Sequence, residues 1–172
     1  MIIVFFGGVM RKFEKVSYDE YKREVGGSME DYNSYHLPKR FTNNSAGYDF
    51  ESIVSFVLHK GETKKIPLGI KVIMNKDEML MLVVRSSIGF KHNVRLCNQV
   101  GIIESDYYDN PTNEGHLFIK LQNEGNDDFV VNKGDRICQG IFVKFLTIDD
   151  EEEINSVRTG GIGSTERNEF NG

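Results

Sequence analysis

From residue 37 onward the sequence consists of short apolar runs separated by glycine, asparagine and aspartate, and this pattern strongly limits the folds open to the chain. Runs rich in Val, Ile, Leu and Phe are typical of strands, and the polar residues between them are typical of turns. Many short strands without helical patterns between them indicate an all-β sandwich or barrel rather than a βαβ fold. The predicted strands are 53–58, 65–73, 79–84, 116–122, 129–131 and 137–145.

The segments around this β-rich region predict its connections and its two ends. Residues 60–62 and 75–77 are predicted hairpin turns, and residues 108–114 a polar loop. Residues 1–36 form an N-terminal extension with short helices, residues 37–148 the β-domain, and residues 149–172 a flexible C-terminal arm. Residues 1–9 are apolar and precede Met10-Arg11-Lys12, so we consider Met10 a possible true start.

Within the N-terminal extension, two helices are expected. Ser17 and Glu20 have the spacing of a capping box, in which each side chain bonds the other residue's backbone N–H. Residues 28–35 predict a second helix, with Met29 and Tyr32 facing inward.

Size, charge and cysteine content narrow the function classes. The 172 residues can bury a substantial core as one domain. The net charge of −5 argues against general nucleic-acid binding, and the apolar start is too short to span a membrane. Cys97 and Cys138 are the only cysteines in the sequence, which favours a reducing cytoplasm over a disulfide framework.

Two polar stretches suggest chemistry on a phosphorylated small molecule. Arg85-Ser86-Ser87-Ile88-Gly89 combines a guanidinium fork, two hydroxyls and a glycine, which together can bind an anion. In Gly101-Ile102-Ile103-Glu104-Ser105-Asp106-Tyr107, the carboxylates at 104 and 106 would share one face of a strand. A phosphate-binding segment near a carboxylate indicates hydrolysis of a phosphorylated small molecule.

Five separated segments, in order, resemble the five motifs of the trimeric dUTPases. They are residues 46–50 (Ala-Gly-Tyr-Asp-Phe), 85–89, 101–107, 134–139 (Gly-Asp-Arg-Ile-Cys-Gln) and 158–165. The resemblance implies a jelly-roll-like β-fold, a homotrimer with active sites shared between subunits, and a C-terminal arm that closes over the substrate. It also implies the reaction: Mg²⁺-assisted attack of water on the α-phosphorus of dUTP, which releases dUMP and pyrophosphate.

The same resemblance implies a role for each matching residue. Arg85, Ser86, Ser87 and Gln139 would bind the phosphates, and Asp135 and Arg136 would be structural. Asp49 would hold waters around Mg²⁺ without binding the metal directly. The nucleoside would lie against Asn98, Ile102, Ile103 and Tyr107, with Asn98 selecting uracil and Tyr107 excluding a 2′-hydroxyl. The arm would contribute Arg158, Ile162, Gly163 and Ser164. Other interpretations stay open, since Asn98 could cap a turn, Tyr107 could be a core aromatic, and Asp49 could be a turn residue.

The sequence departs from the family at two important positions. Glu104 stands where the family has its general base, an Asp, and the extra methylene displaces the carboxylate by about 1 Å unless the backbone compensates. Ile162 stands where the arm normally carries an aromatic residue that covers the uracil, so the arm forfeits stacking. These departures motivate an alternative function, a catalytically weak protein that binds dUTP and regulates a partner. A dCTP deaminase is a third interpretation, disfavoured because Lys120 occupies the place of the deaminase Glu.

Overall fold

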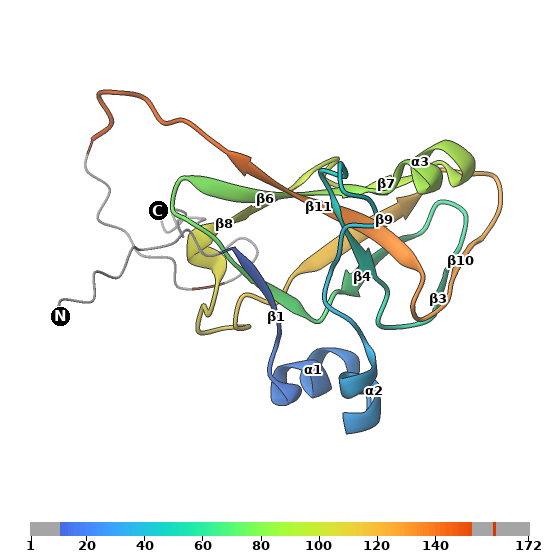
Figure 1. The fold of residues 1–172 in the computed structure, drawn as a ribbon. Coiled ribbons are helices and arrows are strands. Elements are labelled where there is room, and N and C mark those ends of the chain that lie inside the picture. Colours follow the sequence, from blue (N-terminus) through green and yellow to red (C-terminus); the bar gives the residue numbers. More distant parts are fainter. Residues whose placement is uncertain (1–10, 153–159, 161–172) are drawn as a thin grey trace, which may run out of the picture.

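The computed structural model describes residues 11–152 and residue 160, which form small antiparallel sheets (Figure 1). The largest sheet has the strand order β2 (Tyr48–Glu51), β11 (Arg136–Lys144), β6 (Glu78–Val84) and β8 (Gly101–Glu104). A second has the order β4 (Thr63–Pro67), β9 (Phe118–Asn123) and β7 (Val94–Leu96). Two further sheets pair β1 (Lys12–Lys15) with β5 (Ile70–Ile73) and β3 (Phe56–Leu58) with β10 (Phe129–Val131). The predicted all-β, jelly-roll-like fold is confirmed, with sheets that remain open.

The four-stranded sheet has a covered face and an outward face. In β6, Leu80 and Leu82 are almost fully buried, whereas Met79, Met81 and Val83 are partly exposed. Successive side chains of a strand point to opposite faces, so only one face of this sheet packs on the core. Large core side chains come from both larger sheets and include Phe50, Leu80, Leu82, Leu96, Leu121 and Ile137.

The predicted strands are confirmed with shifted boundaries. The predicted strand 65–73 is two strands, because Gly69 has φ +69° and turns the chain between β4 and β5. Glu62 N donates to His59 O at 2.9 Å and Glu78 N donates to Asn75 O at 3.1 Å, which confirms both predicted turns. Neither turn forms a hairpin, since the strands on either side belong to different sheets. Helix α3 (Ser86–His92) was not predicted.

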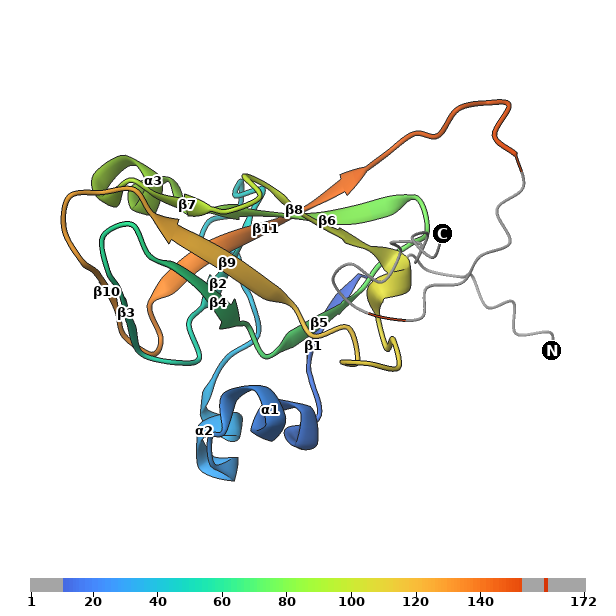
Figure 2. The same cartoon turned by 180° about the vertical axis from the view of Figure 1, so that it is seen from behind.

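The N-terminal extension contains α1 (Tyr18–Val25) and α2 (Met29–Ser34) as predicted, and strand β1 precedes them (Figures 1 and 2). Ser17 Oγ accepts from Glu20 N at 3.1 Å, but the second half of the predicted capping box is wrong, because Ser17 N donates to Glu114 Oε2 at 2.9 Å. The complete capping box lies at Ser28, which starts α2. Met29 is 48% exposed, against the prediction that it faces inward. Within the described residues, no helix is long and apolar enough to cross a membrane.

A buried pair fastens α1 to the sheets. His116 Nδ1 lies 2.9 Å from Glu20 Oε1, and both residues are at most 1% exposed. His116 Nε2 accepts a hydrogen bond of 2.9 Å from Gly69 N. A nitrogen that accepts from a backbone N–H carries no proton, so His116 is neutral and donates to Glu20 through Nδ1.

This pair predicts how stability depends on pH. Burial lowers the pKa of His116 to about 3, whereas an unfolded histidine titrates near about 6.5. Between these values only the unfolded chain binds the proton, so the free energy of unfolding should fall as pH decreases, by up to about 1.4 kcal/mol per pH unit. Burial raises the pKa of Glu20, which acts in the opposite direction at lower pH.

We therefore expect a His116→Gln variant to lose stability less steeply than the unmodified chain as pH falls from about 6.5 to about 5. Urea unfolding followed by circular dichroism at several pH values measures both slopes. Equal slopes would contradict a buried neutral His116.

Candidate active site

Asp49 lies at the centre of a polar cluster at one end of the four-stranded sheet. It is buried, with 6% of its surface exposed. Asp49 Oδ2 accepts from Arg136 Nη1 at 2.9 Å, and Oδ1 accepts from Gln139 Nε2 at 2.8 Å. Arg85 Nε lies 3.4 Å from Oδ1, at ion-pair distance. The cluster therefore joins β2, β11 and the residue that follows β6.

The register of β11 produces this cluster. Asp49 lies opposite Gln139, so the two side chains share a face. A bulge between Arg136 and Cys138 adds a residue to β11, which brings the Arg136 side chain to the same face as Gln139. Gly47 leaves room for the amide, since a Cβ there would lie 3.2 Å from Gln139 Cδ.

The cluster is suited to binding an anion. Each guanidinium has five N–H donors, and Asp49 engages a single nitrogen of Arg85 and of Arg136, so further donors can serve a ligand. Arg85 is also the N-cap of α3, which places Ser86 and Ser87 in the first turn beside it. The structure thus brings the predicted phosphate residues Arg85, Ser86, Ser87 and Gln139 together with Asp49.

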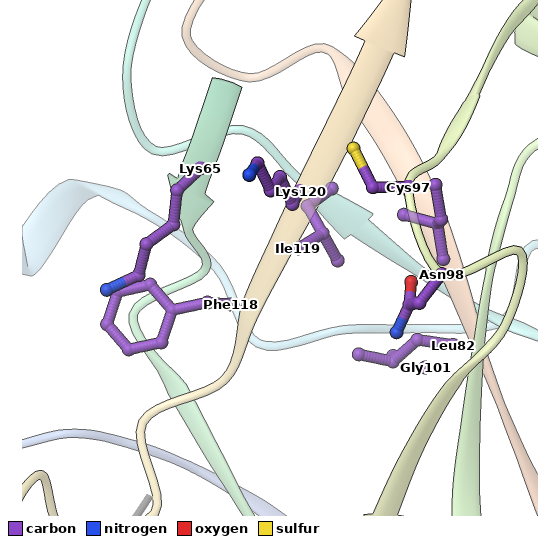
Figure 3. A pocket seen from close by; sticks show the side chains of 9 residues that line it. Lys65, Leu82, Cys97, Asn98, Gly101, Phe118, Ile119 and Lys120 are labelled. Carbon is purple, nitrogen blue, oxygen red and sulfur yellow. The ribbon is translucent and has the colours of Figure 1, made fainter. Parts of the chain in front are cut away.

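A cavity of about 410 Å³ lies between the three-stranded sheet and the neighbouring residues of β6 and β8, Leu82 and Gly101 (Figure 3). Asn98 and Leu82 lie on one side of it, and Phe118 and Lys65 on the other. The remaining lining residues are Leu96, Cys97, Gly101, Ile119 and Lys120. A mostly apolar cavity with a few polar groups is typical of sites for flat organic ligands. Asn98, predicted to select the base, therefore lines a cavity of suitable character.

Strand β8, which follows this cavity, carries three predicted residues on alternating faces. Ile103 is partly buried against the core, whereas Ile102 is 51% exposed on the outward face. Glu104 alternates with Ile103 and is exposed on the same outward face as Ile102. The side chains of Ile102 and Ile103 therefore cannot both face one ligand.

The strand ends at Glu104, which corrects one prediction. Ser105–Tyr107 form a 3₁₀ helix, so the argument that Glu104 and Asp106 share one strand face is wrong. Tyr107 is 8% exposed and its hydroxyl donates to His116 O at 3.1 Å. Its ring is thus held against the loop that leads to β9, next to the end of β8.

Within one chain, the anion cluster and Glu104 lie at opposite ends of β6. Glu104 pairs with Met79, and Arg85 follows Val84, so the two sites are six residues apart along the strand. Six residues of strand span about 20 Å. Asp49, Gln139, Ile102 and Glu104 nevertheless share the outward face. The predicted site is therefore split into two halves on one surface.

Two groups of residues remain: the predicted residues of the C-terminal arm, and cavity residues that belong to no motif. The arm residues lie outside the described part of the chain: Arg158, Ile162, Gly163 and Ser164. Lys65 and Phe118 line the cavity but belong to none of the five motifs, and Lys65 Nζ lies 3.9 Å from the centroid of the Phe118 ring. They sit on strands far from every motif, so no local pattern marks them.

Comparisons with known proteins identify the family of the chain. The family model described as dUTPase matches residues 33–166. The deoxyuridine 5′-triphosphate nucleotidohydrolase of Lactococcus lactis is 45% identical over 131 residues, which cover 76% of this chain and 87% of that protein. The crystal structure of the dUTPase from Streptococcus mutans matches with a TM-score of 0.66 and 36% identity, over 80% of this chain and 98% of that one.

A more distant structure shares the fold. A mutant dUTPase from phage phi11 of Staphylococcus aureus, solved with a coordinated structural Mg(II) ion, matches with a TM-score of 0.62 and 19% identity, over 86% of this chain and 99% of that one. The family match spans most of the chain, including the Asp49 cluster, the Asn98 cavity and Glu104. This chain belongs to the dUTPase family.

Proposed function

We propose that this chain hydrolyses dUTP to dUMP and pyrophosphate. Membership of the family and the 45% identity to a named dUTP nucleotidohydrolase support the reaction. The observation that carries the proposal is the outward face of the four-stranded sheet, which has an anion cluster around Asp49 at one end of β6 and Glu104 at the other. The Asn98 cavity meets β6 at Leu82, between these two ends. A nucleotide pyrophosphohydrolase needs an anion-binding cluster for the phosphates, a cavity for the nucleoside and a carboxylate that can act as a base.

Asn98 and Tyr107 would select the nucleoside by two different means. The Asn98 amide can pair with the uracil edge and leaves the exocyclic amine of cytosine unmatched, so dCTP would be rejected by lost hydrogen bonds. The Tyr107 ring would pack against the deoxyribose and exclude a 2′-hydroxyl sterically. Mismatched polar groups in a desolvated site cost more than a small steric misfit, so rejection of dCTP should be the stronger effect.

The Asp49 cluster would bind the triphosphate. Arg85 and the Ser86 and Ser87 hydroxyls would contact the phosphate oxygens, with Gln139 beside them. Asp49 holds Arg85 and Gln139 in place, and its two oxygens still have lone pairs for waters. This fits Mg²⁺, which keeps several waters and takes most of its other ligands from substrate phosphates. When bound, Mg²⁺ offsets the negative charge of the triphosphate; the phi11 dUTPase neighbour supports a divalent ion in this fold.

Glu104 would act as the general base. It would accept the proton of the water that attacks the α-phosphorus, which turns a poor nucleophile into a better one. Its longer side chain must reach the same water as the family's Asp. The end of β8 at Glu104 and the change of backbone direction at Ser105 offer a place where the backbone could compensate.

Two copies of the chain are needed for one complete site, and we propose the homotrimer of the family. The half-sites lie about 20 Å apart in one chain, so a triphosphate bound at Arg85 cannot reach Glu104 of the same copy. Between them, the outward face carries partly exposed apolar side chains that a second copy would cover: Met79, Met81, Val83, Ile102, Ile141 and Val143. Covering this strip would stabilise the assembly and bring the half-sites together.

One further proposal concerns the compartment of the enzyme. Cys97 and Cys138 are free thiols, which favours a reducing cytoplasm. The regulatory alternative gains no support from the comparisons, because the relative and structures described above are named as dUTPases or dUTP nucleotidohydrolases.

Pyrophosphate release from dUTP, UTP, dCTP and dTTP with Mg²⁺ tests the function. We expect kcat/KM for dUTP to exceed that for dCTP by at least about 10³-fold, because a buried amide loses its partners with cytosine. Tight dUTP binding without pyrophosphate release would favour the regulatory alternative. Ammonia release from dCTP would establish a deaminase instead.

A further inference from the structure

Loop 108–116 winds around Tyr107 and holds its ring by hydrogen bonds at both ends. Asn113 Nδ2 donates to the Tyr107 hydroxyl at 2.8 Å, and that hydroxyl donates to His116 O at 3.1 Å. Asn110 Nδ2 donates to the Tyr107 carbonyl at 2.9 Å and to Asn113 Oδ1 at 2.7 Å. Asn110 is 5% exposed, so these bonds are largely shielded from water. The position of the tyrosine ring is therefore set by the loop.

Residues of β1, of α1 and of the connection between them form hydrogen bonds with the same loop. Ser17 donates to the Glu114 carboxylate from both N and Oγ, at 2.9 and 2.5 Å. Arg23 Nη2 donates to Thr112 O at 3.2 Å. Tyr108 donates from its hydroxyl to a β1 carboxylate, at 2.6 Å. Exposed contacts of this kind contribute little individually, but together they restrain the loop along its length.

The Glu20–His116 pair is the most deeply buried of these links. His116 is the residue whose carbonyl accepts from the Tyr107 hydroxyl, and its ring is fixed between Glu20 and Gly69 N. Moving α1 would therefore move the acceptor that orients Tyr107. A continuous hydrogen-bonded path leads from α1 to the Tyr107 ring, through side chains that are almost fully buried.

We infer that α1 controls discrimination against ribonucleotides, with Glu20 acting as a positioning residue for Tyr107. The inference rests on the proposed function, in which the Tyr107 ring excludes the 2′-hydroxyl. Steric exclusion requires a rigidly held ring. If the Tyr107 ring could move by about 1 Å, the site would accommodate the 2′-hydroxyl oxygen of a ribonucleotide. The N-terminal extension supplies that rigidity from outside the nucleotide cavity.

The test compares kcat/KM for dUTP with kcat/KM for UTP in a set of variants. Glu20→Ala should lower the dUTP/UTP ratio by about tenfold, chiefly because UTP is hydrolysed faster. Glu20→Gln keeps an acceptor for His116 Nδ1 and should retain the original ratio. Glu114→Ala removes the two hydrogen bonds from Ser17 to the loop. Because Glu114 lies at the surface, this variant leaves no buried cavity, and it should lower the dUTP/UTP ratio by a smaller factor.

Lys133→Ala is the matched control. Lys133 Nζ bonds Asp31 of α2 at 2.6 Å, so this variant loosens the extension without touching loop 108–116 and should leave the ratio unchanged. An unchanged ratio in both Glu20→Ala and Glu114→Ala would overturn the inference, as would a proportional loss of both activities. If Glu20→Ala does not fold, Glu114→Ala alone decides the outcome. Failure of the unmodified chain to release pyrophosphate from dUTP would instead refute the proposed function.

Discussion

A Glu104→Gln variant is expected to lose about 10²- to 10⁴-fold in kcat for dUTP, the usual range for removal of a general base. Gln has nearly the same shape but cannot accept a proton from water at neutral pH. The side chain lies on the exposed end of β8, outside the core, so folding should be preserved. Pyrophosphate release measures kcat, and calorimetric titration with a non-hydrolysable dUTP analogue should show nearly unchanged binding.

The Glu104→Asp variant separates two interpretations of the unusual base. If the longer side chain misplaces its carboxylate by about 1 Å, the Asp variant should turn over dUTP faster than the unmodified chain. A slower Asp variant would mean that the site has been built around glutamate. Full activity of the Gln variant would remove Glu104 from the mechanism altogether.

Mixing two inactive variants is expected to restore activity. In an Arg85→Ala chain the anion cluster is damaged but Glu104 remains, and in a Glu104→Gln chain the reverse holds. If each site takes its anion cluster from one copy and its carboxylate from another, random co-assembly of equal amounts leaves about a quarter of the sites intact. Activity should therefore rise from nearly zero to about a quarter of that of the unmodified protein.

Co-expression of the two chains with different affinity tags, followed by tandem purification and a pyrophosphate assay, measures this recovery. Tandem purification removes assemblies of a single chain type, so about a third of the sites should be intact in the purified mixed trimers. A chain carrying both substitutions, co-expressed with itself, is the matched control and should stay inactive. No recovery in verified mixed assemblies would place Glu104 and Arg85 of one chain in the same site, against the separation along β6. Sedimentation of the unmodified protein as a monomer would exclude the homotrimer.

Local patterns were good predictors of the strands and of the motif residues. Alternation in β6 and the turn residues at 60–62 depend on neighbouring positions only, so both could be inferred without tertiary contacts. The resemblance assigned Arg85 and Gln139 to the phosphates and Asp49 to waters around Mg²⁺, and the structure brings both phosphate residues within hydrogen-bond or ion-pair distance of Asp49. The prediction that Glu104 and Asp106 share a face failed because the backbone leaves the extended conformation after Glu104.

The role of the Glu20 side chain could not be predicted from neighbouring residues. Its spacing from Ser17 indicated a capping box, yet its side chain is buried against His116, which lies 96 residues later in the chain. Only half of the predicted cap forms: Ser17 Oγ accepts from Glu20 N, whereas the Glu20 side chain accepts from the buried His116 ring instead of from Ser17 N.

The all-β fold class, most of the strands after residue 52 and the residue types of the motifs could be predicted from the sequence alone, because each depends on short-range periodicity or on a compact motif. Strands β1 and β2 were not predicted. Only the tertiary structure decided that a bulge turns Arg136 toward Asp49, that Glu104 and Arg85 lie at opposite ends of one strand, and that α1 braces the loop around Tyr107. These features depend on strand register and on contacts between distant residues, and the free energy that selects among them comes from packing the whole chain at once.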